Sequence, residues 1–197
     1  MFRRMLMGLA IAVVVSAAGA AVWVGNGSAQ AAEEMFFGDD ADVAFAERLW
    51  RELAATRLVG PNALTSRPYE GVEPHGAILV TLQGDLAIAE DTGGEHTGAV
   101  IVKYNYMGES VSVSSVADNP DRNLAAVTVM FRRAEGYDSE NLDWFWAKYS
   151  SDGSLQTNPQ GVRMAGRIGK NPQDACIACH KFAPGDDYVF LNDQLAR

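Results

Sequence analysis

A C-x-x-C-H motif, Cys176 to His180, makes the strongest demand on the fold, because such a motif is typical of chains built around a prosthetic group. Two cysteines one helical turn apart can form thioether bonds with the two vinyl groups of a haem. The histidine that follows directly can place its imidazole on the iron from the same side. We therefore predict one covalently bound haem c, with Cys176 and Cys179 as attachment residues and His180 as axial iron ligand.

Other uses of the two thiols fit the sequence less well. The alternative is a redox pair or a disulfide that happens to precede a histidine, but a thioredoxin-like site would need a β-α-β context, which is absent here. A zinc site would need two more ligands, for which only His75 and His96 are available. Because the whole chain has two cysteines, a scaffold built on several disulfides is excluded.

The N-terminal segment has the layout of an export signal. A short basic stretch, residues 1–4, precedes an uncharged apolar run, residues 5–24, and a small-x-small cleavage site ends at Ala31. We predict a signal peptide over residues 1–31, with an uncleaved membrane anchor as the alternative, because the run is nearly long enough to span a bilayer. Whether the segment is a cleaved signal peptide or an uncleaved anchor, we expect residues 32–197 to be exported, to the periplasm or an equivalent compartment. We expect these residues to form a single domain.

The charge balance narrows the range of partners. A formal net charge of -9 results from 16 Lys and Arg against 25 Asp and Glu. The clustered cations that bind nucleic acid are therefore lacking. The 48% of apolar residues is ordinary for a globular protein, so we predict a folded domain that does not bind nucleic acid.

Hydrophobic periodicity predicts one helix followed by several strands. Residues 41–54 place apolar side chains at helical spacing. Asp85 can cap a short helix over residues 86–89, whereas residues 64–74 and 156–173 have the composition of loops. Short runs of β-branched and aromatic residues predict strands at residues 76–82, 98–106, 124–132 and 143–149. We expect an α+β fold, mainly an antiparallel β-sheet with an N-terminal helix and a short C-terminal haem-binding helix.

Lys103 occupies an unusual position in the second predicted strand. It shares a face with Ala99 and Ile101, because alternate residues of a strand point to the same side. Its side chain can therefore be partly buried, which lowers the pKa of a lysine and exposes a neutral, nucleophilic amine. The alternative is a lysine near a strand end whose ammonium group reaches solvent along its aliphatic stem.

The fourth predicted strand is rich in aromatic residues. Trp144 and Trp146 share one face, and Phe145 and Tyr149 the other. Large aromatic side chains on a strand are mostly found in the core or at a dimer interface. The alternative is that one of them lies against the haem.

Asp174 lies two residues before Cys176 and has two interpretations. Its carboxylate can transfer protons in a pocket on the distal side of the haem. It can equally cap the short helix that carries the cysteines. Glu95, His96 and Glu109 are weaker candidates for proton transfer.

Several further motifs resemble those of the cytochrome P-460 family and of its relatives, the cytochromes c′-beta. The resemblance covers roughly residues 75–193, and its most distinctive block is DWFWAKY at residues 143–149. One departure is Tyr104, because many members of the family carry a glutamate directly after the lysine that corresponds to Lys103. The other matches are, in chain order, Pro74-His75-Gly76, residues 98–106, residues 124–130, Gly136-Tyr137-Asp138, the C-x-x-C-H motif and residues 187–190.

The resemblance implies a mainly antiparallel β-sheet body, found as a homodimer, with one haem c. His180 would be the proximal ligand, and the distal face of the iron would be open. In cytochromes P-460 a lysine bonds covalently to the haem ring, and by motif this residue is Lys103. These enzymes oxidise hydroxylamine and pass the electrons to a soluble acceptor such as a small cytochrome, so the resemblance implies an enzyme that acts on a small nitrogen compound.

Two other functions stay open at this point. The cytochromes c′-beta bind nitric oxide or carbon monoxide, and an apolar distal wall with phenylalanine or methionine over the iron would favour such diatomic gases. A plain electron carrier would need a sixth iron ligand. That ligand would come from Met107, Met130, Met164 or His96, since no methionine follows His180.

Overall fold

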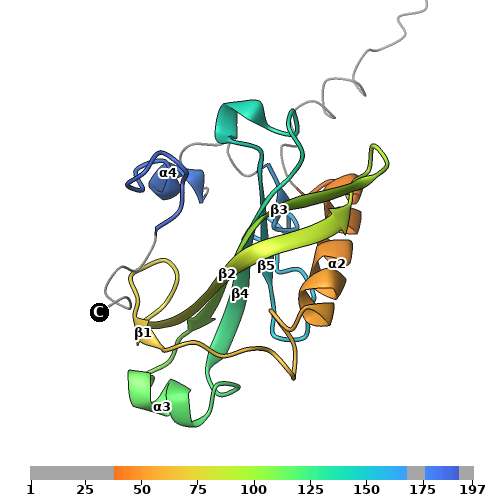
Figure 1. Ribbon diagram of the computed structural model, residues 1–197. Coiled ribbons are helices and arrows are strands. Elements are labelled where there is room, and N and C mark those ends of the chain that lie inside the picture. The colour runs from red at the N-terminus through yellow and green to blue at the C-terminus, as the bar shows by residue number, and fades with distance from the viewer. Residues whose placement is uncertain (1–37, 168–175, 191–197) are drawn as a thin grey trace, which may run out of the picture.

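A six-stranded antiparallel β-sheet forms the body of the protein in a computed structural model that describes residues 38–167 and 176–190 (Figure 1). The sheet order follows the chain order, and the strands are β1 (Tyr69–Glu70), β2 (Ile78–Ala89), β3 (Glu95–Tyr106), β4 (Leu124–Arg132), β5 (Trp144–Tyr149) and β6 (Ala165–Gly166). The helical elements are α2 (Asp40–Ala55), α3 (Val113–Asp118), the 3-10 turn η1 (Ser139–Asn141) and α4 (Ile177–His180). The predicted α+β class is confirmed, with a helix before the sheet and a short helix at the C-x-x-C-H motif.

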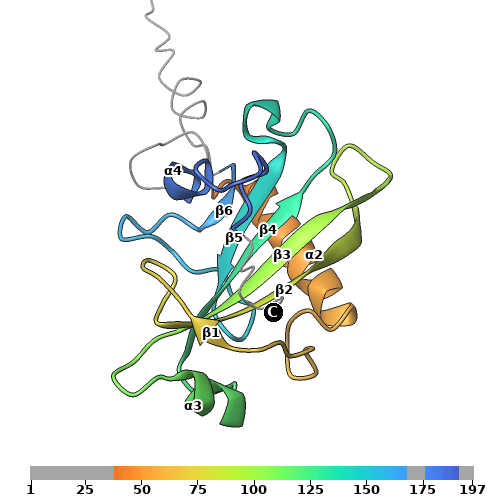
Figure 2. The same ribbon diagram turned by 60° about the vertical axis from the view of Figure 1, so that its left-hand side comes forward.

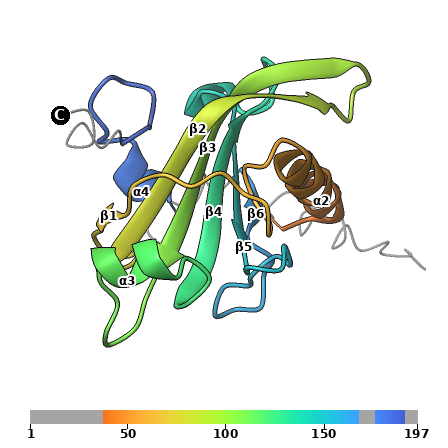
Figure 3. The same ribbon diagram turned by 60° about the horizontal axis from the view of Figure 1, so that its bottom comes forward.

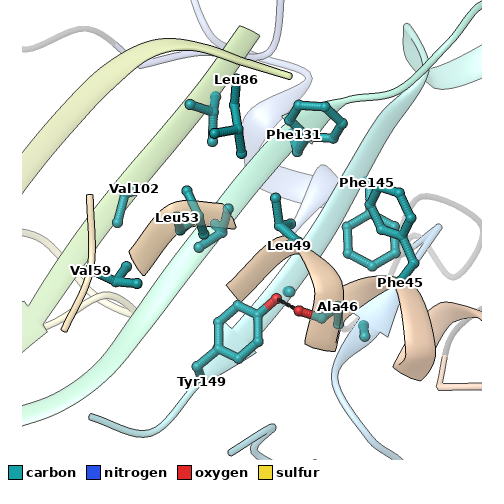
Figure 4. Close-up of a cluster of buried hydrophobic side chains, with 14 of the residues drawn as sticks. Phe45, Ala46, Leu49, Leu53, Val59, Leu86, Val102, Phe131, Phe145 and Tyr149 are labelled. Atoms are coloured by element: carbon teal, nitrogen blue, oxygen red, sulfur yellow. Dashed lines mark hydrogen bonds between the residues drawn. The ribbon is translucent and has the colours of Figure 1, made fainter. Parts of the chain in front are cut away.

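Helix α2 packs on one face of the sheet and forms the main core with it (Figures 3 and 4). Phe45, Leu49 and Leu53 recur at helical spacing and are fully buried against the strands. The hydroxyl of Tyr149 donates a hydrogen bond to the carbonyl of Ala46 at 2.9 Å. This bond satisfies a buried phenol and joins β5 to the helix.

The opposite face of the sheet carries the C-terminal segment. Figures 1 and 3 show α4 and α2 on opposite sides of the sheet. Alternation along β5 separates the two faces, because Phe145 belongs to the core under α2 whereas Trp144 and Trp146 pack with Val189. The candidate site lies on this second face.

Strand β2 is longer than the sequence predicted. The prediction of a short helix over residues 86–89 is wrong, because β2 runs through these residues as far as Ala89 and pairs with β3 along its whole length. Leu86 and Ile88 are buried while Ala87 between them is exposed, which is the period of a strand. Pairing across the hairpin outweighs the local capping signal of Asp85.

Short elements also occur where the sequence patterns predicted neither a helix nor a strand. Helix α3 begins with a capping box, in which the side chains of Ser112 and Ser115 each accept a hydrogen bond from the other residue's backbone N–H. Strands β1 and β6 have two residues each and fall within the predicted loops. Elements this short lack the periodicity from which a sequence pattern is recognised.

Two sequence predictions concern residues for which the structure gives no description. Residues 1–31, the predicted signal peptide or anchor, and Asp174 both lie outside the described residues. Within residues 38–167 and 176–190, no helix combines the length and the apolar character needed to cross a bilayer. The division into an export signal and a single domain therefore stays a prediction.

Replacement of Asp42 by Asn is expected to remove a pH-dependent loss of stability. Asp42 is buried on α2 and accepts a hydrogen bond from the Tyr137 hydroxyl at 3.2 Å, and burial together with the nearby Asp39 raises its pKa to about 6. The folded state thus binds a proton more tightly than the unfolded state, so the free energy of unfolding falls as the pH rises from about 4 through about 6. The predicted loss is about 2–3 kcal/mol.

Urea denaturation at a series of pH values measures this loss. The Asp42→Asn protein keeps an acceptor for Tyr137 and should show a flatter stability profile between pH 4 and pH 7 than the wild type. Glu47→Gln, an exposed position on the same helix, serves as the control and should leave the profile unchanged. Equal slopes for Asp42→Asn and the wild type would contradict the assignment.

Candidate functional site

The sheet face that packs against the C-terminal segment presents two rows of aligned side chains, and Figure 2 shows this side turned toward the viewer. The first row, on β2 to β5 in turn, is Thr81, Lys103, Thr128 and Lys148. The next row, on β3 to β5, is Ile101, Met130 and Trp146. Cys176 and Val189 of the C-terminal segment pack over these rows, so the motif and the sheet form one site.

A cavity lies between the two rows and the C-terminal segment. Its unfilled space, including the part open to solvent, is about 530 Å³. The lining residues are Ile101, Lys103, Thr128, Val129, Met130, Trp146, Ala147, Lys148, Met164, Cys176, His180, Val189 and Phe190. Most of these side chains are apolar, and the described lining includes two lysines but no carboxylate.

His180 is held in one orientation by the segment that follows it. Its side chain is 6% exposed, and Nδ1 donates a hydrogen bond to the backbone carbonyl of Tyr188 at 2.7 Å. Burial lowers the pKa of His180, which favours the neutral ring. With the proton on Nδ1, the lone pair of Nε2 is free to bind a metal, which is the usual arrangement of a metal-ligating histidine.

The two cysteines are free thiols on the same turn of chain. The backbone N–H groups of Cys179 and His180 both donate to the carbonyl of Cys176, so the motif is wound as a helix. Cys176 lines the cavity, where burial raises the pKa of its thiol, and Cys179 is exposed. Two thiols one turn apart beside an imidazole with a free Nε2 form a donor set that fits haem c.

Lys103 lies in the same cavity as Cys176 and His180. It is 9% exposed, and burial lowers the pKa of its amine. Ile101 lines the cavity beside it, whereas Val102 faces α2, as the alternation of the strand predicted. The structure therefore brings three of the predicted site residues, Lys103, Cys176 and His180, into one cavity, whereas Cys179 is exposed on the same turn as Cys176.

Tyr104, the departure from the family pattern, is on the other face of the sheet. Its hydroxyl donates to the backbone carbonyl of Leu58 at 2.8 Å, in the loop after α2. Tyr104 thus acts in packing on the side of the sheet away from the cavity.

One of the two tryptophans of β5 lies at the site. The ring centroid of Trp146 is 5.0 Å from that of His180, with the rings nearly perpendicular. Trp144 is buried next to the cavity, and its Nε1 donates to the carbonyl of Asp187 at 2.9 Å. These residues hold the C-terminal segment on the sheet, and Trp146 forms the wall against His180.

His75 lies next to His180, although the sequence indicated it only as a possible zinc ligand and as part of one family motif. Its ring centroid is 5.9 Å from that of His180, and Nδ1 is 3.1 Å from Oδ1 of the buried Asn105. Burial and the charges of Lys103 and His180 lower the pKa of His75 to about 4, so its ring is neutral at pH 7. Its place within the Pro74-His75-Gly76 motif was the one signal that could have identified it.

Two of the proposed sixth ligands lie at the cavity and two do not. Met130 and Met164 line it, whereas Met107 and His96 are absent from its lining. His96 is bonded elsewhere, with Nε2 3.1 Å from the carbonyl of Arg132.

Comparison with known proteins agrees with the geometry of the site. A sequence model of the family described as Cytochrome P460 matches residues 65–191, which include both the cavity-lining strands and the C-x-x-C-H motif. No curated protein and no solved structure gives a significant match. Membership of this family implies a c-type haem, in agreement with the donor set of Cys176, Cys179 and His180. Since the match spans well over half of the sequence, the chain belongs to the cytochrome P460 family.

Proposed function

We propose that this protein is an exported, mono-haem c-type cytochrome with an open distal iron site that oxidises hydroxylamine and passes the electrons to a soluble acceptor such as a small cytochrome. The observation that carries the proposal is the buried position of Lys103 in the same cavity as Cys176 and His180. Family membership supports it, because the family includes hydroxylamine-oxidising haem enzymes. A homodimer is the proposed assembly.

Three residues of the C-x-x-C-H motif would hold the haem. Cys176 and Cys179 would bind the haem covalently, and His180 would bind its iron through Nε2. When bound, the haem supplies an iron that coordinates the nitrogen of the substrate and accepts its electrons. The hydrogen bond from Nδ1 of His180 to Tyr188 keeps the imidazole oriented and raises its basicity as a ligand.

Lys103 is the proposed polar group at the edge of the haem ring, because it lines the cavity with Cys176 and His180. The lowered pKa of Lys103 raises the fraction of neutral amine, which is the form that can bond to the haem ring. His75, next to His180, has a pKa of about 4 and stays neutral near pH 7, so it is proposed to hold the site through its hydrogen bond with Asn105 rather than to take up protons. Asp174 is the proposed proton-transfer group.

A second function, binding of nitric oxide or carbon monoxide as in the cytochromes c′-beta, is favoured by the apolar character of the wall. Ile101, Met130 and Phe190 line the cavity, and its described lining offers no carboxylate to take up protons. Such a wall suits a neutral diatomic molecule better than a polar substrate.

The absorption spectrum of the purified ferrous protein separates the two functions. A Soret band shifted strongly to the red, together with hydroxylamine-dependent reduction of a soluble cytochrome, is expected for the lysine-modified enzyme. An ordinary five-coordinate, high-spin spectrum without this reduction would favour the gas-binding protein. In both cases carbon monoxide should bind without delay. A slow displacement step before binding would reveal an internal sixth ligand and contradict the open iron site.

A further inference from the structure

A second lysine, Lys148, faces the same cavity and has no role in the proposed chemistry. It lies on β5 directly opposite Thr128, and Thr128 lies opposite Lys103 on the next strand. Adjacent strands are about 4.8 Å apart, so the two lysines arise about 10 Å apart on one face of the sheet. Both line the cavity.

Lys148 places a positive charge on the wall of the cavity, and no negatively charged partner for it is found among the described residues. The four ion pairs found among the described residues do not include Lys148, and no carboxylate is present in the described lining of the cavity. Lys148 and Cys176 line the same cavity. The charge is therefore close to where the haem would be attached.

Trp146 adds a hydrogen-bond donor with no described partner. It lies two residues before Lys148 on the same face of β5, is 3% exposed and lines the cavity. Its Nε1 is buried and makes no hydrogen bond within the described part of the chain. A buried N–H group left unpaired is unfavourable, so a bound partner that accepts a hydrogen bond from it would be favoured.

We propose that Lys148 and Nε1 of Trp146 form a binding site for an anionic oxygen group in the haem cavity. An ammonium group and an indole N–H only donate hydrogen bonds, so they select a group that only accepts them, such as a carboxylate or a small oxyanion. The group can come from two sources, a carboxylate of the bound haem itself or a free oxyanion such as nitrite. The inference rests on the proposed haem site, but not on hydroxylamine as substrate.

The test uses ferric holoprotein titrated with sodium nitrite and, separately, with neutral imidazole, each followed by absorbance. The variants are Lys148→Met and Trp146→Phe, and Lys148→Arg is the charge-retaining counterpart. Arg51→Gln is the matched control, because it removes one positive charge from the exposed surface of α2, on the other side of the sheet. The reduction potential of the haem is measured as a function of pH on the same proteins.

If the site takes a free oxyanion, Lys148→Met should weaken nitrite binding about tenfold or more, which corresponds to the loss of one charged hydrogen bond. Trp146→Phe should weaken it less, imidazole binding should stay unchanged, and Lys148→Arg should restore nitrite binding. If the site takes a haem carboxylate, nitrite binding should stay unchanged. The carboxylate pKa seen in the potential–pH curve should then rise in Lys148→Met and not in Arg51→Gln.

The proposal would be overturned if Lys148→Met had the same nitrite affinity and the same potential–pH curve as the control Arg51→Gln. If Lys148→Met does not yield holoprotein, Trp146→Phe decides by the same two measurements. Hydroxylamine oxidation is assayed separately on the wild type. If the protein does not oxidise hydroxylamine but Lys148→Met still weakens nitrite binding, only the proposed enzyme function is contradicted. Absence of covalent haem in the wild type would contradict the haem site on which both depend.

Discussion

Replacement of Cys176 and Cys179 by Ala, combined with Lys103→Leu, is expected to leave no haem on the denatured chain. The two thiols lie on one turn of chain beside a histidine with a free Nε2, and they would supply the thioether bonds of a haem c. Lys103 lies in the same cavity, and its amine is the remaining proposed point of attachment to the haem ring. The measurement is haem staining of the protein after denaturing electrophoresis, and the expected loss is complete.

The partial variants show which bond carries the haem. With Lys103 retained, the double cysteine variant can keep haem only through the lysine, so any stain that it shows should disappear in the triple variant. Lys103→Leu alone should stain like the wild type, because both thioether bonds are intact. Covalent haem in the triple variant would show that none of these three residues is needed and would overturn the assignment.

The elements with long, clean periodicity were predictable from the sequence. Helix α2 begins and ends within one residue of the predicted range, and β4 has the predicted bounds. The error at residues 86–89 arose because a capping aspartate is a local signal. The pairing of β2 with β3 is a contact between chain segments that no local pattern contains.

The site was predictable only where its residues are adjacent in the sequence or belong to a known motif. The C-x-x-C-H motif directly indicates the three residues expected to hold the haem, and strand alternation predicts the face on which Lys103 lies. Lys148 reaches the cavity through the hydrogen-bond register of β4 and β5, and His75 comes next to His180 through packing of the loop before β2. Register depends on how distant strands pair, so a single sequence does not specify which side chains meet across the sheet.

Replacement of Lys103 by Leu is expected to separate the proposed enzyme from a gas-binding protein. Leu has roughly the volume of the lysine stem, so the buried position stays filled while the nucleophilic amine is lost. In a protease digest of the wild type, mass spectrometry should find the peptide around Lys103 joined to the haem peptide around Cys176. In the variant the two peptides should be separate.

Hydroxylamine oxidation should fall by about 10- to 100-fold in Lys103→Leu, the range typical of losing a group that tunes a metal site. Carbon monoxide binding should survive, because His180 and its bond to Tyr188 are untouched. Lys103→Arg is the control for charge, because a guanidinium stays protonated and cannot bond to the ring; it should match Lys103→Leu. If the two peptides are already separate in the wild type, the enzyme proposal loses its main support, and the apolar cavity wall then makes gas binding the better-supported function.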